Sequence, residues 1–195
     1  MGAPRGAEPG RSLHLGCGTR KQPGTVGVDR VRLREVDVLW DLNRRPYPFR
    51  SNSFDSVYLV EILEHLDDVY GVLAEVQRLC RPGADVFITT PHFSSVNAYS
   101  DPTHKHYFST HALDNCIWGR ESFQFYTDLR FELVEISLGI PGAGGPLRRI
   151  AHSFINRFQS FYEKHLIYLF PVHALYFHLR VAKKSPLEGD EGAAR

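Results

Sequence analysis

Residues 84–90 read ADVFITT, and this run constrains the fold more than any other stretch of the chain. A near-continuous run of apolar and β-branched side chains is typical of a strand buried on both faces, as in parallel sheets covered by helices. Other β-type runs occur at residues 12–15, 26–28, 36–39, 54–60, 131–138 and 174–182. Strands interspersed with helices predict an α/β fold with a mostly parallel sheet.

Helical periodicity is strongest over residues 61–80, where apolar positions recur at spacings of three and four. We expect one helix there, ended by the RPG that follows, because Pro and Gly past a C-terminus stop helices. A second helix is predicted from a cap at Ser109 through Trp118. A third, helical and rich in aromatic residues, is expected as an insertion at about residues 146–170, after the break PGAGGP.

The composition of the 195 residues indicates one domain, expected at residues 12–183, with disordered tails at 1–11 and 184–195. The 23 basic and 22 acidic residues nearly cancel, which argues against a nucleic-acid partner. Three cysteines match no metal or disulfide spacing and favour a reducing cytoplasm. We expect a soluble domain, because the chain shows neither a signal-peptide core nor an apolar stretch long enough for a transmembrane segment.

The stretch LHLGCGTRKQPGTVGVD at residues 13–29 reads as a strand, a tight turn and a second strand that ends in an acid. In an open α/β sheet the ligand lies beyond the carboxyl ends of the strands. Gly16 and Gly18 allow the backbone to approach a ligand closely, and Asp29 can accept hydrogen bonds from both hydroxyls of a ribose. TRKQPG is too short for the usual crossover helix, so no helix N-terminus follows to hold a pyrophosphate. The stretch predicts a nucleoside ligand without a diphosphate.

Asp41 and Leu42 extend this pocket from the end of the third predicted strand. The Asp41 carboxylate can accept from an exocyclic amine, and Leu42 offers its backbone and an apolar contact to a base, so the pocket suits adenosine. Glu61, at the end of the fourth strand, can reach the ligand or a substrate. The alternatives are an ordinary tight turn for the glycines, a strand-end turn residue for Asp29, a cap for Asp41 and an exposed helical acid for Glu61.

Four stretches resemble, in order, the motifs of class I S-adenosylmethionine-dependent methyltransferases, and of the methyltransferase type 11 group in particular. LHLGCGT resembles the first motif and GVD the ribose-binding acid; DLNRRPYPFRSNSFDSVYLVEILEHL resembles the adenine-binding segment, and LCRPGADVFITTP the fifth strand with its preceding turn. The resemblance covers residues 12–91 well and 92–183 only in general layout. It implies a Rossmann-like class I methyltransferase fold with an antiparallel last strand.

The resemblance also implies S-adenosylmethionine as the cofactor. The residues it assigns to cofactor binding are Gly16, Cys17, Gly18, Asp29, Asp41, Leu42 and Glu61. The chain departs from the family in lacking a third glycine, the helix between the first two strands and the N-terminal helices. A less covered cofactor is expected to bind more weakly, or to need substrate, a partner subunit or the aromatic helix as a lid.

Histidines gather in the long loop that follows the fifth strand, where family members often bind substrate; long loops in compact domains are often functional. We consider His65, His92 and His106 as general bases and His104 and Tyr107 as substrate-binding residues. Structural or solvated histidines are the main alternative. No metal is expected, because no acidic or thiol ligand accompanies the loop histidines at a recognised spacing.

The predicted function is a biosynthetic methyl transfer from S-adenosylmethionine to a small-molecule acceptor. The EILEH sequence stands where N-methyltransferases often carry Asn/Asp-Pro-Pro-aromatic, which favours an oxygen or carbon acceptor. Two alternatives stay open: a non-methylating relative with a structural or regulatory role, and a nucleotide-sugar or NAD-binding enzyme, against which the absent third glycine argues. The aromatic stripe at residues 147–170 suits core packing, an acceptor pocket, a homodimer contact or a lipid surface.

Overall fold

The computed structural model describes residues 11–120, 127–139 and 146–182, and these form one seven-stranded sheet with the order β3-β2-β1-β4-β5-β7-β6. The strands are β1 (Ser12–Leu15), β2 (Thr25–Asp29), β3 (Val38–Leu39), β4 (Phe54–Val60), β5 (Cys80–Pro91), β6 (Phe131–Leu138) and β7 (Ala174–Val181). The first five are parallel, and β7 runs antiparallel to both β5 and β6. The predicted fold class, a mostly parallel sheet with an antiparallel last strand, is confirmed.

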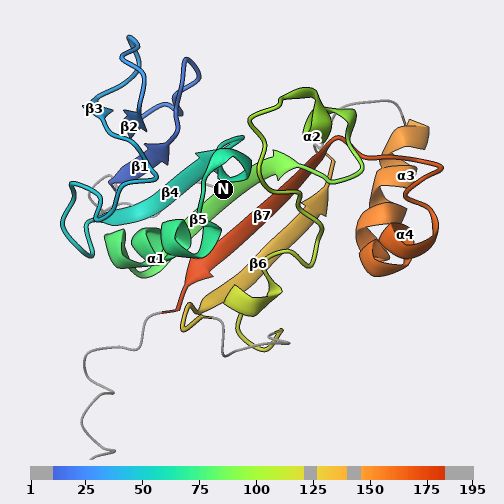
Figure 1. Cartoon of the computed structure of the whole chain (residues 1–195). Coiled ribbons are helices and arrows are strands. Elements are labelled where there is room, and N and C mark those ends of the chain that lie inside the picture. The colour runs from blue at the N-terminus through green and yellow to red at the C-terminus, as the bar shows by residue number, and fades with distance from the viewer. Residues whose placement is uncertain (1–10, 121–126, 140–145, 183–195) are drawn as a thin grey trace, which may run out of the picture.

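The helices are α1 (Val69–Leu79), α2 (Val96–Ser100), α3 (Pro146–Arg157) and α4 (Gln159–His165), with 3₁₀ turns η1 (Leu63–His65) and η2 (Asp114–Cys116). In Figure 1, α1 lies in front of the sheet, and α3 and α4 lie beside the end of β6 and the start of β7. The core lies between α1 and the central strands, where Val57 pairs with Val86 and Leu59 with Ile88, all four fully buried. Among the described residues, no helix combines the length and apolar character needed to cross a bilayer.

The helix predicted over residues 61–80 is wrong at its start. The structure has the separate turn η1, and α1 begins only at Val69, because the carboxylate of Asp68 accepts the backbone N–H of Gly71 at 2.9 Å as an N-cap. Between β4 and η1 lies Glu61, a non-glycine residue in the left-handed region with a φ of 51°.

Two other predicted helices also differ from the structure. The segment from Ser109 to Trp118 holds only the turn η2, because the backbone N–H of Trp118 bonds instead to the carbonyl of Phe131 in the sheet. The aromatic insertion forms two helices with a break at Phe158, whose ψ of 46° is not helical. The predicted tails lie outside the described residues, apart from Arg11.

The connection from β1 to β2 is a loop of nine residues in place of a helix, as the sequence predicts. His14, buried in β1, supports it: the ring nitrogen Nδ1 accepts the backbone N–H of Gln22 at 3.1 Å. Burial lowers the pKa of His14, although the charge of Asp29 opposes this, so the ring stays neutral and able to accept. The side chain of a strand residue thus holds the short loop against the sheet.

Candidate functional site

A cavity of about 640 Å³ opens at the carboxyl ends of β1, β2 and β4. Its volume lies within the range of small-molecule sites, and its position is where open α/β sheets bind ligands. Of the predicted site residues, it is lined by Gly16, Gly18, Asp29, Asp41, Leu42, Glu61 and His65. The prediction missed Arg30, Val31, Leu33, Trp40, Asn43, Ile62, Leu66, Asp101, Thr103 and Lys105.

The Gly-x-Gly turn forms one wall of this cavity. Gly16 has a φ of 67°, and a Cβ there would lie 2.3 Å from Cγ1 of Ile62, so only glycine fits between the turn and the opposite loop. Gly18 has a φ of 48° and open space around it. Cys17 lies between them but is not a lining residue: its thiol is buried, 4.0 Å from the carbonyl oxygen of Glu35. The two glycines, and not the cysteine side chain, face the ligand space.

Asp29 lies at the end of β2 with both carboxylate oxygens fixed by the backbone. Oδ2 accepts the N–H of Gly18 and Oδ1 the N–H of Val31, each at 2.9 Å. A carboxylate oxygen has two lone pairs, so each retains one for a further donor. Two oriented acceptors side by side are what the vicinal hydroxyls of a ribose require, and the site fits a nucleoside.

The adjacent wall comes from the segment after β3. Trp40 lines the cavity, and its indole N–H donates to the carbonyl of Arg44 at 3.0 Å, which fixes the ring. Asp41 accepts the backbone N–H of Asn43 at 3.0 Å through one oxygen, and Leu42 is buried beneath it. An oriented aromatic ring, a carboxylate and an apolar side chain suit an adenine base. The aromatic residue directly after the strand was the available sequence signal for Trp40.

The far wall brings together η1 and the loop after α2. His65 Nδ1 lies 2.8 Å from the hydroxyl of Thr103, and the His65 and His104 rings meet edge to face with centroids 4.6 Å apart. Burial lowers the pKa of His65, and the neighbouring His104 lowers it further. Burial also raises the pKa of Glu61, with His104 opposing. This wall therefore carries one imidazole, that of His65, with a lowered pKa beside a carboxyl group that ionises less readily than usual.

Glu64, in η1, is a further residue of this region that the sequence prediction overlooked. Its side chain is 1% exposed, and burial raises its pKa to about 7. Its backbone carbonyl accepts the N–H groups of Lys105 and His106, at 2.8 and 3.3 Å, so η1 and the histidine loop are joined here. The available signal was its place between Leu63 and His65 in the LEH sequence.

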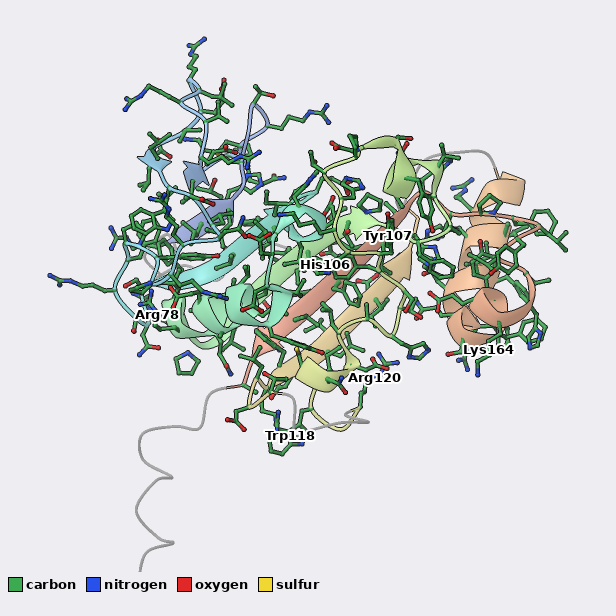
Figure 2. The ribbon with its side chains drawn as sticks, in the orientation of Figure 1. Arg78, His106, Tyr107, Trp118, Arg120 and Lys164 are labelled. Atoms are coloured by element: carbon green, nitrogen blue, oxygen red, sulfur yellow. The ribbon has the colours of Figure 1, made fainter. Side chains whose placement is uncertain are left out.

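The other predicted residues lie away from the cavity. His92 is fully buried, with Nε2 3.0 Å from Oε1 of Glu163 and Nδ1 2.9 Å from the hydroxyl of Ser94. His106 contacts the carbonyl of Leu66 through Nε2 at 2.9 Å. Tyr107 is half exposed and stacks on another tyrosine, 4.9 Å away. Figure 2 shows His106 and Tyr107 on the loop that crosses in front of the sheet.

Comparison with known proteins finds similarity to methyltransferases. A family model described as a methyltransferase domain matches residues 22–88. A ubiquinone biosynthesis O-methyltransferase of Hahella chejuensis is 33% identical over 108 residues, 44% of this chain and 45% of the relative. A cycloartenol-C-24-methyltransferase of Arabidopsis thaliana is 33% identical over 75 residues, 37% of this chain and 22% of the relative. The chain thus spans less than half the length of these curated relatives.

The fold has close counterparts among solved structures. A S-adenosylmethionine-dependent methyltransferase from Archaeoglobus fulgidus superposes with a TM-score of 0.54 at 19% identity, covering 87% of this chain and 85% of that one. Together, the family match and the shared fold confirm the resemblance to class I S-adenosylmethionine-dependent methyltransferases. They also bear out S-adenosylmethionine as the cofactor that the resemblance implies.

Proposed function

We propose that this chain, with its methyltransferase-domain match and class I methyltransferase fold, transfers a methyl group from S-adenosylmethionine to an oxygen or carbon atom of a small molecule. The observation that carries the proposal is the cavity at the ends of β1, β2 and β4, with Asp29 offering two oriented acceptors. Of the two curated relatives, one is named as an O-methyltransferase and the other as a C-24-methyltransferase, which supports these two acceptor classes.

Different residues of the cavity would contact different parts of the cofactor. Asp29 would accept from the ribose hydroxyls, and Trp40, Asp41 and Leu42 would hold the adenine. Gly16 and Gly18 would let the methionine portion lie against the turn, directed toward Glu61. Bound S-adenosylmethionine supplies an electrophilic methyl group on a sulfonium. The chain contributes alignment and exclusion of water, worth up to about 7–11 kcal/mol in well-oriented reactions.

The acceptor would enter beside His65, the one predicted base that lines the cavity. Since its pKa is lowered, its ring is neutral near pH 7 and able to take the proton of a hydroxyl acceptor, a contribution on the order of 100- to 10,000-fold. His104 is in contact with His65, so we retain it as a substrate-binding residue. His92, His106 and Tyr107 make contacts that serve the loop, and we propose no chemical step for them.

Cofactor binding is tested by thermal unfolding with and without S-adenosylhomocysteine, in wild type, Asp29→Ala and Asp37→Ala. Asp37 is a matched control: it also accepts a backbone N–H, from Gly27 at 2.7 Å, but does not line the cavity. Ligand at a hundred times its Kd adds about 2.7 kcal/mol, or roughly 5–10 °C for a domain of this size. Wild type and Asp37→Ala should show this shift and Asp29→Ala should not. Equal shifts in all three would refute the assignment.

A non-methylating relative remains the second candidate, because loops replace the helices between β1 and β2 and between β2 and β3. Such a protein would bind S-adenosylmethionine with a structural or regulatory role. Formation of S-adenosylhomocysteine across a panel of phenols, enols and sterols separates the two candidates. Bound cofactor with no product in any reaction would favour the second.

We also propose that the apolar surface of α4 and the segment after it contacts a second copy of this chain. Phe161, Tyr168, Leu169 and Phe170 are each more than half exposed, and a contiguous apolar patch of this kind marks an interaction site. A dimer in light scattering that becomes a monomer in Leu169→Asp supports this; a wild-type monomer at all concentrations refutes it. The three cysteines are buried and form no disulfide, which agrees with a cytoplasmic location that cell fractionation would test.

A further inference from the structure

We propose that Glu64, His65 and His104 form a binding site for a divalent transition-metal ion, beside the cofactor cavity and open to the methyl acceptor. The sequence predicted no metal, because it offered no acidic ligand next to the loop histidines. The structure supplies one from η1, 40 residues away from His104 along the chain. The existence of the site is independent of the proposed function; only its role toward the acceptor rests on that function.

The three side chains converge. One carboxylate oxygen of Glu64 and one ring nitrogen each of His65 and His104 all lie within 4.8 Å of one another. In a tetrahedral site with bonds of about 2.0–2.1 Å, ligand atoms lie roughly 3.3–3.5 Å apart. Side-chain movements of about 1 Å therefore close the site around an ion. The backbone bonds from Lys105 and His106 to the carbonyl of Glu64 hold the two segments at this separation.

The burial of the Glu64 carboxylate without a hydrogen-bond partner points to a missing ligand. The side chain is 99% buried, yet among the described residues neither carboxylate oxygen has a hydrogen-bond partner. The backbone N–H of Glu64 itself and the hydroxyl of Thr90 are near enough to oppose the rise in its pKa, but neither makes a hydrogen bond of normal geometry to the carboxylate. Burying a carboxylate without compensation costs several kcal/mol, and nearly all buried polar groups are paired. A cation between Glu64 and the two imidazoles would compensate both oxygens.

The hydrogen bonds of the two histidines leave the correct nitrogens free. Nδ1 of His104 lies 2.8 Å from the carbonyl oxygen of Ala98, which only accepts, so Nδ1 carries the proton. The Thr103 hydroxyl donates to the carboxylate of Asp101 at 2.7 Å and therefore accepts from Nδ1 of His65. In both rings Nε2 then carries a lone pair. Metal-binding histidines typically show this arrangement, in which the second nitrogen donates to a carbonyl or carboxylate partner.

The three protein ligands determine which metal ions the site prefers and what a bound ion could do for the acceptor. Two imidazoles and one carboxylate suit Zn²⁺, Co²⁺, Ni²⁺ or Fe²⁺, whereas Mg²⁺ and Ca²⁺ prefer all-oxygen sites. Three protein ligands leave a position for a hydroxyl of the acceptor, whose pKa the ion would lower. The hydroxyl proton passes to water, and an O–C bond forms as the sulfonium C–S bond breaks, its electron pair remaining on the thioether. His65 would then be a ligand and not a base.

Binding of Co²⁺ tests whether Glu64, His65 and His104 form a metal site. Tag-free, chelator-treated protein is titrated with Co²⁺ and followed by visible d–d absorption, with bound metal counted by atomic emission after dialysis. We expect one Co²⁺ per chain in wild type and in His111→Gln, which removes an exposed histidine outside the group. Glu64→Gln and His104→Gln should raise the Kd by about 100-fold or more, and Thr103→Val, which removes only the partner of His65, by about 10- to 100-fold.

The site is refuted if wild type shows the spectrum of hydrated Co²⁺ throughout, or if His111→Gln loses the metal as completely as Glu64→Gln. Circular dichroism of each variant shows whether a loss reflects unfolding, and Glu64→Asp, which keeps the carboxylate, should restore part of the affinity. S-adenosylhomocysteine binding is measured on the same samples. Protein that binds S-adenosylhomocysteine but no Co²⁺ overturns the metal site alone, and the reverse result overturns the proposed function alone.

Discussion

Glu64 is buried and Glu163 is largely buried, each beside a histidine, and the hydrogen bonds of the two carboxylates differ. Glu163 uses both oxygens: Oε1 accepts from His92 and from the backbone N–H of Thr110, and Oε2 accepts from the Thr110 hydroxyl. Burial tends to raise its pKa, but these hydrogen bonds from His92 and Thr110 outweigh it and leave the pKa lowered. Glu64 has no such bonds among the described residues, and burial raises its pKa to about 7.

This difference indicates that the Glu163 carboxylate stabilises the fold and that the Glu64 carboxylate is available to bind a ligand. The Glu163 group joins α4 to the loop after β5, and each of its two oxygens already accepts at least one hydrogen bond. The Glu64 group lies beside the cavity and keeps its lone pairs unused. A glutamate–histidine pair in the sequence is thus no guide to function until the partners of each oxygen and nitrogen are known.

Removing Glu163 should have the largest effect on stability. Glu163→Ala leaves His92 and the N–H of Thr110 buried without a partner, and breaking a buried pair in this way costs about 3–5 kcal/mol. The unfolding midpoint should fall by roughly 6–20 °C, measured by calorimetry. Lys164→Ala is the control, since this exposed neighbour on α4 should change the midpoint little (Figure 2). A Glu163 variant as stable as the control would mean that the network is unimportant.

The contribution of Glu163 should also depend on pH. Its pKa is lower in the folded protein than its ordinary value of 4.5, so its stabilising effect is complete above 4.5. The effect is lost as the pH falls through the folded pKa. The difference in unfolding free energy between wild type and Glu163→Gln should therefore be constant from pH 7 to about 5 and shrink in more acid solution. A difference that grows on acidification would contradict the lowered pKa.

Glu64→Gln should have the smallest effect on stability. In metal-free protein no hydrogen bond of the carboxylate is lost, so we expect a change within about 1 kcal/mol, or roughly 2–4 °C, in either direction. Chemical denaturation of chelator-treated wild type and variant measures it. A loss as large as that of Glu163→Ala would show that Glu64 has a structural partner, and the contrast between the two groups would fail.

The parts of the fold that depend on local pattern were predictable from sequence. The bounds of β1, β4 and β6 follow from apolar runs, and Gly16 and Asp29 follow from the turn and strand end that contain them. The start of α1 was placed too early because apolar periodicity continues through η1, and only the cap at Asp68 marks the true start.

The contacts between distant segments were not predictable. His92 finds its partner 71 residues away on α4, so its place in the histidine loop gave no information about its environment. Glu64 lies next to His65 in sequence, but its burial depends on the loop at 101–106 folding back across η1. Pairings of this kind have no local pattern, since they are decided by packing after the sheet has formed.

Hydrogen–deuterium exchange with and without saturating S-adenosylhomocysteine tests the central claim most directly, because it locates the ligand. The account predicts slower exchange in peptides covering residues 13–20, 29–43 and 61–67, which line the cavity, and no change in peptides covering 158–166 around Glu163. Slower exchange confined to the Glu163 region, or nowhere at saturating ligand, would contradict the assignment of the cavity as the cofactor site.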